Sequence, residues 1–155
     1  MTDIDVDAVL NLAGFDPDQS VLTRRQAAVL ALRERDLTQS TIAEHFGTSR
    51  ANVASIESSA RENVDKAQET VAVAEALHAP VQVSVGPDTD LYDVPPKVFS
   101  ACDEADLKVP HTAPELLSKV RDGAGDAVVG RVVRHPLSVS VSADGEIQVR
   151  RQNED

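Results

Sequence analysis

The chain has almost no aromatic residues: three Phe, one Tyr and no Trp among its 155 residues. Its apolar content is ordinary at 41%, so the core must be built mainly from Val, Ala and Leu. A single cysteine excludes an internal disulfide and fits a reducing cytosol. No apolar run approaches the roughly 18 residues of a membrane-spanning helix, and the acidic N-terminus lacks the basic region of a signal peptide. These absences predict a cytoplasmic protein that has no membrane partner.

Lysine is also scarce, with four Lys against eleven Arg, and the formal net charge is -11. An acidic, Lys-poor composition suits the salt-rich cytoplasm of a halophilic archaeon, and a mildly acidic mesophilic protein is the alternative. The acidity is uneven. Residues 1–22 carry five acids and no Lys or Arg, residues 23–61 carry six Arg against four acids, and residues 62–155 carry nine basic residues against seventeen acids. Only residues 23–61 have the net positive charge that binding to phosphates requires.

Residues 38–60 have the side-chain pattern of a helix-turn-helix. Thr38 and Ser49 are suited to cap the N-termini of two helices, and Gly47 between them suits a left-handed turn. Both helices have an apolar inner face, made by Ile42, Ala43 and Phe46 on the first and by Val53 and Ile56 on the second. Such a pair can place its second helix in the major groove of DNA.

A third helix is expected just upstream, because Thr23 and Gln26 have the spacing of a capping box. Its apolar side consists of Val29, Leu30 and Leu32. Together with Leu37 from the following loop, this side would complete a three-helix core. Thr48 departs from the pattern, since the residue after the turn glycine is usually apolar in this motif. A plain helical bundle is the alternative interpretation.

The periodicity divides the chain into four segments with an α+β fold overall. Residues 1–20 are expected to be a flexible or loosely packed acidic arm, residues 21–61 the helix-turn-helix domain, and residues 62–79 a connecting helix that Pro80 ends. Residues 80–155 form a small α+β domain. Its expected strands are residues 81–85, 127–133, 139–141 and 147–149. Its expected helices are residues 97–107 and 114–121.

The connecting helix has a short apolar stripe, consisting of Val64, Ala67, Val71 and Ala74. The stripe must be covered, because an isolated helix is stable only when its apolar face is packed. It can fold back on residues 81–150 or pair with a second copy. We favour a homodimer, because two half-sites about one DNA turn apart would supply the specificity that one small reader lacks.

The second helix of the motif supplies the candidate base contacts, which point away from its core-facing side. Arg50 in the first turn can pair with guanine O6 and N7, Asn52 can read adenine, and Ala51 can pack on a thymine methyl. Ser55 can contact a base or a phosphate. The alternatives are a phosphate contact or a solvated side chain for Arg50, and ordinary surface polarity for Asn52 and Ser55.

Phosphate contacts are expected from two sources. Helix N-termini bind phosphate through their free N–H groups, and arginines add charge. The candidates are Thr38, Gln39 and Ser49 at the helix N-termini, and Arg24 and Arg25 upstream.

Four stretches carry a family resemblance: residues 22–26, 49–67, 86–95 and 105–109. They resemble the Tfx family of archaeal DNA-binding transcriptional regulators, and the helix-turn-helix is also similar to region 4 of sigma factors. The resemblance implies a sequence-specific regulator that binds double-stranded DNA. The transcription machinery is a further expected partner. The resemblance carries over no base preference.

The sequence suggests neither an enzyme nor a cofactor. The four histidines have no metal-ligand spacing, Cys102 is expected to be a buried thiol, and Asp88, Asp90 and Asp93 lack the glycine and terminal Glu of a calcium loop. The open alternative is a small-molecule sensor or protein-interaction module in residues 80–155, with the helix-turn-helix as a targeting device.

Overall fold

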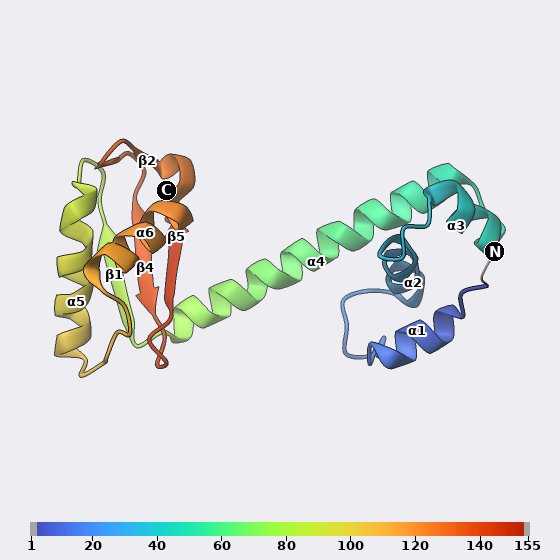
Figure 1. Ribbon diagram of the computed structural model, residues 1–155, viewed down its shortest axis with the longest axis horizontal. Coiled ribbons are helices and arrows are strands. Elements are labelled where there is room, and N and C mark those ends of the chain that lie inside the picture. The colour runs from blue at the N-terminus through green and yellow to red at the C-terminus, as the bar shows by residue number, and fades with distance from the viewer. Residues whose placement is uncertain (1–2, 154–155) are drawn as a thin grey trace. The chain divides into compact units, whose positions relative to one another are not determined.

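The structure is a computed structural model that describes residues 3–153 (Figure 1). The chain forms two compact units that divide within one long helix, between Val71 and Ala72. The N-terminal unit is helical, and the C-terminal unit combines helices with antiparallel strands, so the predicted α+β class is confirmed. No helix within residues 3–153 has both the length and the apolarity to cross a membrane.

The N-terminal unit contains α1 (Val6–Leu12), α2 (Arg24–Arg33), α3 (Gln39–Phe46) and the start of α4 (Arg50–His78). The capping box of α2 is present: Gln26 N–H donates to Thr23 Oγ1 over 3.1 Å, and Thr23 N–H donates to Gln26 Oε1 over 3.0 Å. The last three helices share one buried cluster, as predicted, made of Val29, Leu32, Ile42, Ala43 and Val53.

The acidic N-terminal segment is not the loosely packed arm that its composition suggests. Asp5 caps α1 by accepting a hydrogen bond from Ala8 N–H, and Leu10 is buried against Ala27 and Ala28 of α2. Val6 and Leu10 lie one turn apart, which gives this short helix an apolar face despite the surrounding acids. The expectation of a flexible arm is therefore wrong for α1.

The C-terminal unit is built on an antiparallel sheet of β1 (Val81–Val85), β4 (Leu137–Val141) and β5 (Ile147–Arg151), in the order β1-β4-β5. In the register, Val139 lies opposite Val83 on one side and Val149 on the other. The 3-10 turn η1 (Leu91–Asp93) leads into α5 (Val94–Glu104), and α6 (Ala113–Ala124) follows.

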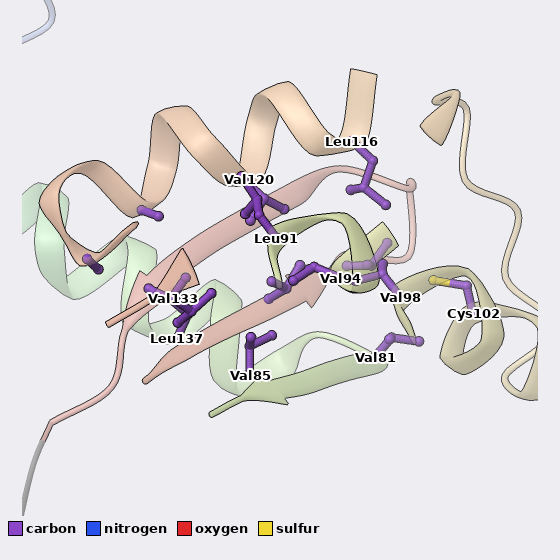
Figure 2. Packing of buried hydrophobic residues seen from close by; sticks show 14 residues of the cluster. Val81, Val85, Leu91, Val94, Val98, Cys102, Leu116, Val120, Val133 and Leu137 are labelled. Atoms are coloured by element: carbon purple, nitrogen blue, oxygen red, sulfur yellow. The ribbon is translucent and has the colours of Figure 1, made fainter. Parts of the chain in front are cut away.

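Aliphatic side chains fill the space between these helices and the sheet (Figure 2). Valine dominates this core, as the shortage of aromatic residues predicts, and the fully buried members include Val85, Leu91, Val98, Leu116, Val120 and Leu137. The thiol of Cys102 points into the same core from α5 (Figure 2). The core is therefore continuous from β1 to α6.

Both helices of the C-terminal unit have boundaries that differ from the sequence-based expectation. Helix α5 begins at Val94 instead of Lys97, because prolines are tolerated in the first turn of a helix. It ends at Glu104 instead of Leu107. Helix α6 continues past Arg121 through Gly123, where a Cβ atom would lie 2.7 Å from Cβ of Val149. Gly123 thus allows close packing of helix on strand and does not end the helix.

The single strand expected at residues 127–133 is also wrong. The segment instead forms η2 (Gly125–Ala127) and a small hairpin of β2 (Val128–Val129) and β3 (Val132–Val133), with Gly130 in the turn at φ +64°. A β-branched run reads as one strand until a left-handed glycine interrupts it. The predicted hairpin between β4 and β5 is present, with Gly145 at φ +84°.

Candidate nucleic-acid interface

The turn between α3 and α4 sets where the outward face of α4 begins. Gly47 adopts the left-handed conformation, with φ +67° and ψ +37°, and ends α3. Ser49 Oγ then accepts a hydrogen bond of 3.1 Å from Asn52 N–H, which caps the new helix. Arg50 is therefore the first residue of α4, as the helix-turn-helix pattern predicts.

The two faces of α4 are divided as its periodicity requires. Val53 and Ala60 are fully buried, whereas the predicted base contacts are exposed: Arg50, Ala51, Asn52 and Ser55. Within residues 3–153, the Arg50 guanidinium has no hydrogen bond or ion pair. A solvated arginine in the first turn of an exposed helix face can approach a ligand without first breaking an internal contact.

The Asn52 side chain, unlike that of Arg50, already has a hydrogen-bond partner. Its Nδ2 donates a hydrogen bond of 2.9 Å to Thr48 Oγ1. Thr48 is the position where the sequence departs from the usual apolar residue, and this bond gives its hydroxyl a partner. Reading adenine bidentately needs both the amide oxygen and the amide nitrogen, so Asn52 would have to exchange its Thr48 bond for a base.

A buried ion cluster holds the three helices of the motif together. Glu57 on α4 is 7% exposed, and its carboxylate lies 2.9 Å from Arg33 Nε and 2.9 Å from Arg61 Nη2. Gln39 Nε2 donates to Glu57 Oε1 over 3.1 Å. Arg33 comes from α2, Gln39 from α3 and Arg61 from α4, so one carboxylate joins all three helices.

The cluster keeps Glu57 ionised. Burial raises the pKa of the Glu57 carboxyl, but the hydrogen bonds from Gln39 and Arg61 and the charges of Arg33 and Arg61 together outweigh burial. The pKa of Glu57 therefore lies below its usual value. Sequence reasoning did not identify this residue, because a glutamate within a helix-turn-helix is expected to be solvated.

The cluster also occupies the side chain of Gln39, which was expected to bind phosphate through the N–H groups of the helix N-terminus. That side chain is half-buried and bonded to Glu57. The other two residues expected at helix N-termini are exposed caps: Thr38 Oγ1 accepts from Thr41 N–H over 3.1 Å, and Ser49 caps α4. Only the backbone of Gln39 remains suited to an anion.

Arg24 and Arg25 are exposed at the start of α2 and already have partners. Arg24 forms an ion pair with Asp7 of α1. The Arg25 guanidinium lies 4.3 Å from the ring centroid of Phe46, within range of a cation–π interaction. Both arginines line a cavity of about 710 Å³, together with the carboxylates of the N-terminal segment. The acidic segment therefore lies beside the two arginines expected to bind phosphate.

Comparison with known proteins covers both units. Residues 67–149 match the family model described as the C-terminal part of the DNA-binding protein TFX, and residues 20–66 match region 4 of sigma-70. A relative from Haloarcula marismortui is 52% identical over 150 residues, covering 97% of this chain and 94% of the relative. The chain belongs to the Tfx family.

Two relatives of the chain have names that refer to transcription or to DNA binding. The Haloarcula protein bears the provisional name of a transcriptional regulatory protein. A protein from Methanothermobacter thermautotrophicus, named DNA-binding protein Tfx, is 32% identical over 131 residues, covering 84% of this chain and 95% of the relative. In the present Tfx chain, the two family matches meet inside α4, at residues 66 and 67.

Polar groups of the C-terminal unit form structural contacts. Asp90 accepts from Arg131 Nη2 over 2.6 Å and from Tyr92 N–H over 3.0 Å, and these bonds lower the pKa of Asp90. Cys102 is 1% exposed, and burial, followed by the charge of Asp103, raises the pKa of its thiol. Among residues 3–153, no group of three or more His, Cys, Asp or Glu is placed to hold a metal ion.

Proposed function

We propose that this Tfx family member is a sequence-specific transcriptional regulator that reads the DNA major groove with the first turn of α4. The observation that carries the proposal is Arg50, which is exposed and unpaired within residues 3–153 at the N-terminus of that helix. The first turn of a recognition helix enters the groove, and arginine pairs bidentately with guanine. The surrounding segment 23–61 is the part of the chain with net positive charge.

The remaining candidates take supporting roles in this proposal. Ala51 packs on a thymine methyl, Asn52 exchanges its Thr48 bond for adenine, and Ser55 contacts a base or the backbone. Phosphates are held by the N-termini of α3 and α4, at Thr38, the backbone of Gln39 and Ser49, and by Arg24 and Arg25.

Selection of the full-length protein against a pool of random DNA duplexes tests this function, and a genome-wide binding experiment then locates its targets. We expect one enriched motif that contains a guanine at a fixed position. Retention of all duplexes with equal affinity would contradict sequence-specific reading, because contacts to phosphate alone carry no sequence information.

The ion pair between Asp7 and Arg24 gives a further prediction. Asp7→Asn is expected to tighten DNA binding about two- to fivefold, because it removes a carboxylate and frees Arg24 from a surface pair worth up to ~1 kcal/mol. Asp122→Asn, at an exposed position on α6, is the charge-matched control. Equal affinities of the two variants, measured by fluorescence anisotropy at one salt concentration, would show that Arg24 does not contact phosphate.

We also propose that the protein acts in the cytoplasm as a non-enzymatic homodimer that requires no cofactor. Support comes from the apolar stripe of α4, where Val71 is 57% exposed. A dimer would present two copies of Arg50 to two half-sites. The acidic composition supports adaptation to high salt, and contact with the transcription machinery would follow from the regulatory role.

A further inference from the structure

Strand β1 is an open edge of the sheet. Within residues 3–153 it pairs only with β4, so its other side presents unpaired backbone groups. Its sequence is Val-Gln-Val-Ser-Val, without charge or proline. Soluble proteins usually protect such edges with charged residues, and the opposite edge strand β5 carries Arg150 and Arg151. The uncharged β1 edge is therefore the side of the sheet suited to pairing with another strand.

A shallow groove runs along this open edge. It has a volume of about 570 Å³ and lies between the middle of β1, at Val83, and one face of α5. The α5 residues that line it include Lys97, Ser100, Ala101 and Glu104. These positions are spaced by three, one and three residues, so they form a single helix face. The centre of that face is made of two small side chains, and its ends carry opposite charges.

We propose that β1 of a second copy of this chain occupies this edge, antiparallel to the first, and forms a six-stranded sheet across a two-fold axis. The strand is self-complementary about Val83. An axis through that residue places Val83 opposite the partner's Val83, and Gln82 opposite the partner's Ser84. Antiparallel pairing about such an axis keeps α5 of both copies on the same face of the sheet.

The charges on α5 favour this occupant over an unrelated peptide. Lys97 and Glu104 are exposed, and neither has an ion-pair partner within residues 3–153. The two-fold axis runs the two α5 helices in opposite directions, so Lys97 comes beside the partner's Glu104, and the reverse pair forms at the other end. Ser100 and Ala101 between them are small enough for close approach of the helices. The exposed face of α5 is thus complementary in charge to the same face of a second copy.

This inference rests on the homodimer proposed above, but it places the interface on β1 and α5 instead of on the apolar stripe of α4, and it involves none of the DNA-reading residues. Sedimentation equilibrium of the full-length protein measures the dimer dissociation constant. Lys97→Glu and Glu104→Lys are each expected to raise that constant about tenfold or more, since each turns two attractive pairs into repulsive ones. The double reversal should restore the parent value, because the pairs re-form with exchanged signs.

The register of the strands has its own test. The Val83→Cys variant should form a disulfide-linked dimer on mild oxidation, because the two cysteines lie directly opposite each other. Gln82→Cys is the matched control and should remain uncross-linked, while a mixture of Gln82→Cys and Ser84→Cys should cross-link. The native Cys102 is buried and contributes little background.

A monomer at 100 times the protein concentration used for DNA binding would overturn the inference. So would a dimer that Val71→Asp disrupts and that both charge reversals leave intact, because its interface would then be α4. DNA binding is measured on the same samples. A parent protein that prefers one DNA sequence but stays monomeric, or dimerises through α4, contradicts this interface alone. A parent protein without any sequence preference contradicts the proposed function.

Discussion

Replacing Glu57 with alanine is expected to lower the free energy of unfolding of the N-terminal unit by about 3 kcal/mol. The substitution leaves Arg33 without its anion and Gln39 without its acceptor, and it empties a space at the junction of three helices. Removal of one partner from a buried ion pair costs ~3–5 kcal/mol. We expect the lower end of that range, because the side chains of Arg33 and Arg61 are 34% and 52% exposed.

Chemical denaturation followed by circular dichroism measures this change. Glu62→Ala is the matched control, because Glu62 lies on the same helix and pairs with Lys66 at 3.2 Å on the open surface. The control should change the free energy of unfolding by no more than about 0.5 kcal/mol. Equal losses in both variants would show that the Glu57 cluster stabilises the fold no more than a surface pair does.

The same carboxylate makes stability depend on pH. The pKa of Glu57 is lower in the folded protein than in the unfolded chain, so its ionised form is stabilised by folding. This contribution is fully present above the ordinary pKa near 4.5 and is lost as the pH falls through the lower, folded value. Glu57→Gln should therefore lose less stability than the parent on acidification below pH 4.5. Parallel pH profiles for the two proteins would contradict this linkage.

Replacing Arg50 with alanine is expected to weaken binding to the preferred DNA site by about 1–3 kcal/mol, or about 5- to 150-fold. The loss should be specific. Binding to a duplex of unrelated sequence should change much less, because a base contact adds little when the base it reads is absent. The guanine that Arg50 reads should also become the position at which the variant tolerates any base.

Arg121→Ala is the control for the loss of one positive charge, since Arg121 lies on α6 in the C-terminal unit. Titrations of both variants with both duplexes, at one salt concentration, separate the loss of a base-specific contact from the loss of non-specific electrostatic attraction to DNA. If Arg50→Ala reduced affinity equally for both duplexes, Arg50 would be a phosphate contact, which is the alternative that its sequence position leaves open.

The helix-turn-helix was predictable because its signals are local. Thr38, Gly47 and Ser49 satisfy backbone groups within three or four residues of themselves, so their caps and turn follow from the order of residues alone. Helix α1 was missed because it has only seven residues, and its two apolar contacts are surrounded by acids. Gly123 was misread for a different reason, since its neighbour Val149 lies far away in the sequence.

The candidate site divides in the same way. The outward face of α4 follows from helical periodicity once Val53 is placed in the core. The contacts that occupy side chains do not follow from helical periodicity, because each contact joins two separate helices: Arg24 with Asp7, and Gln39 with Glu57. Sequence reasoning could therefore identify which residues point outward, but not which of them already have partners.

The buried thiol of Cys102 is a built-in probe for the opening of the C-terminal unit. A thiol-specific reagent reacts only when the core of that unit opens, because Cys102 is 1% exposed and has a raised pKa. The chain has no other cysteine, so the labelling rate measures the opening of this unit alone. An unchanged rate in Glu57→Ala would assign all of the lost stability to the N-terminal helices, whereas a faster rate would show that the two units open cooperatively.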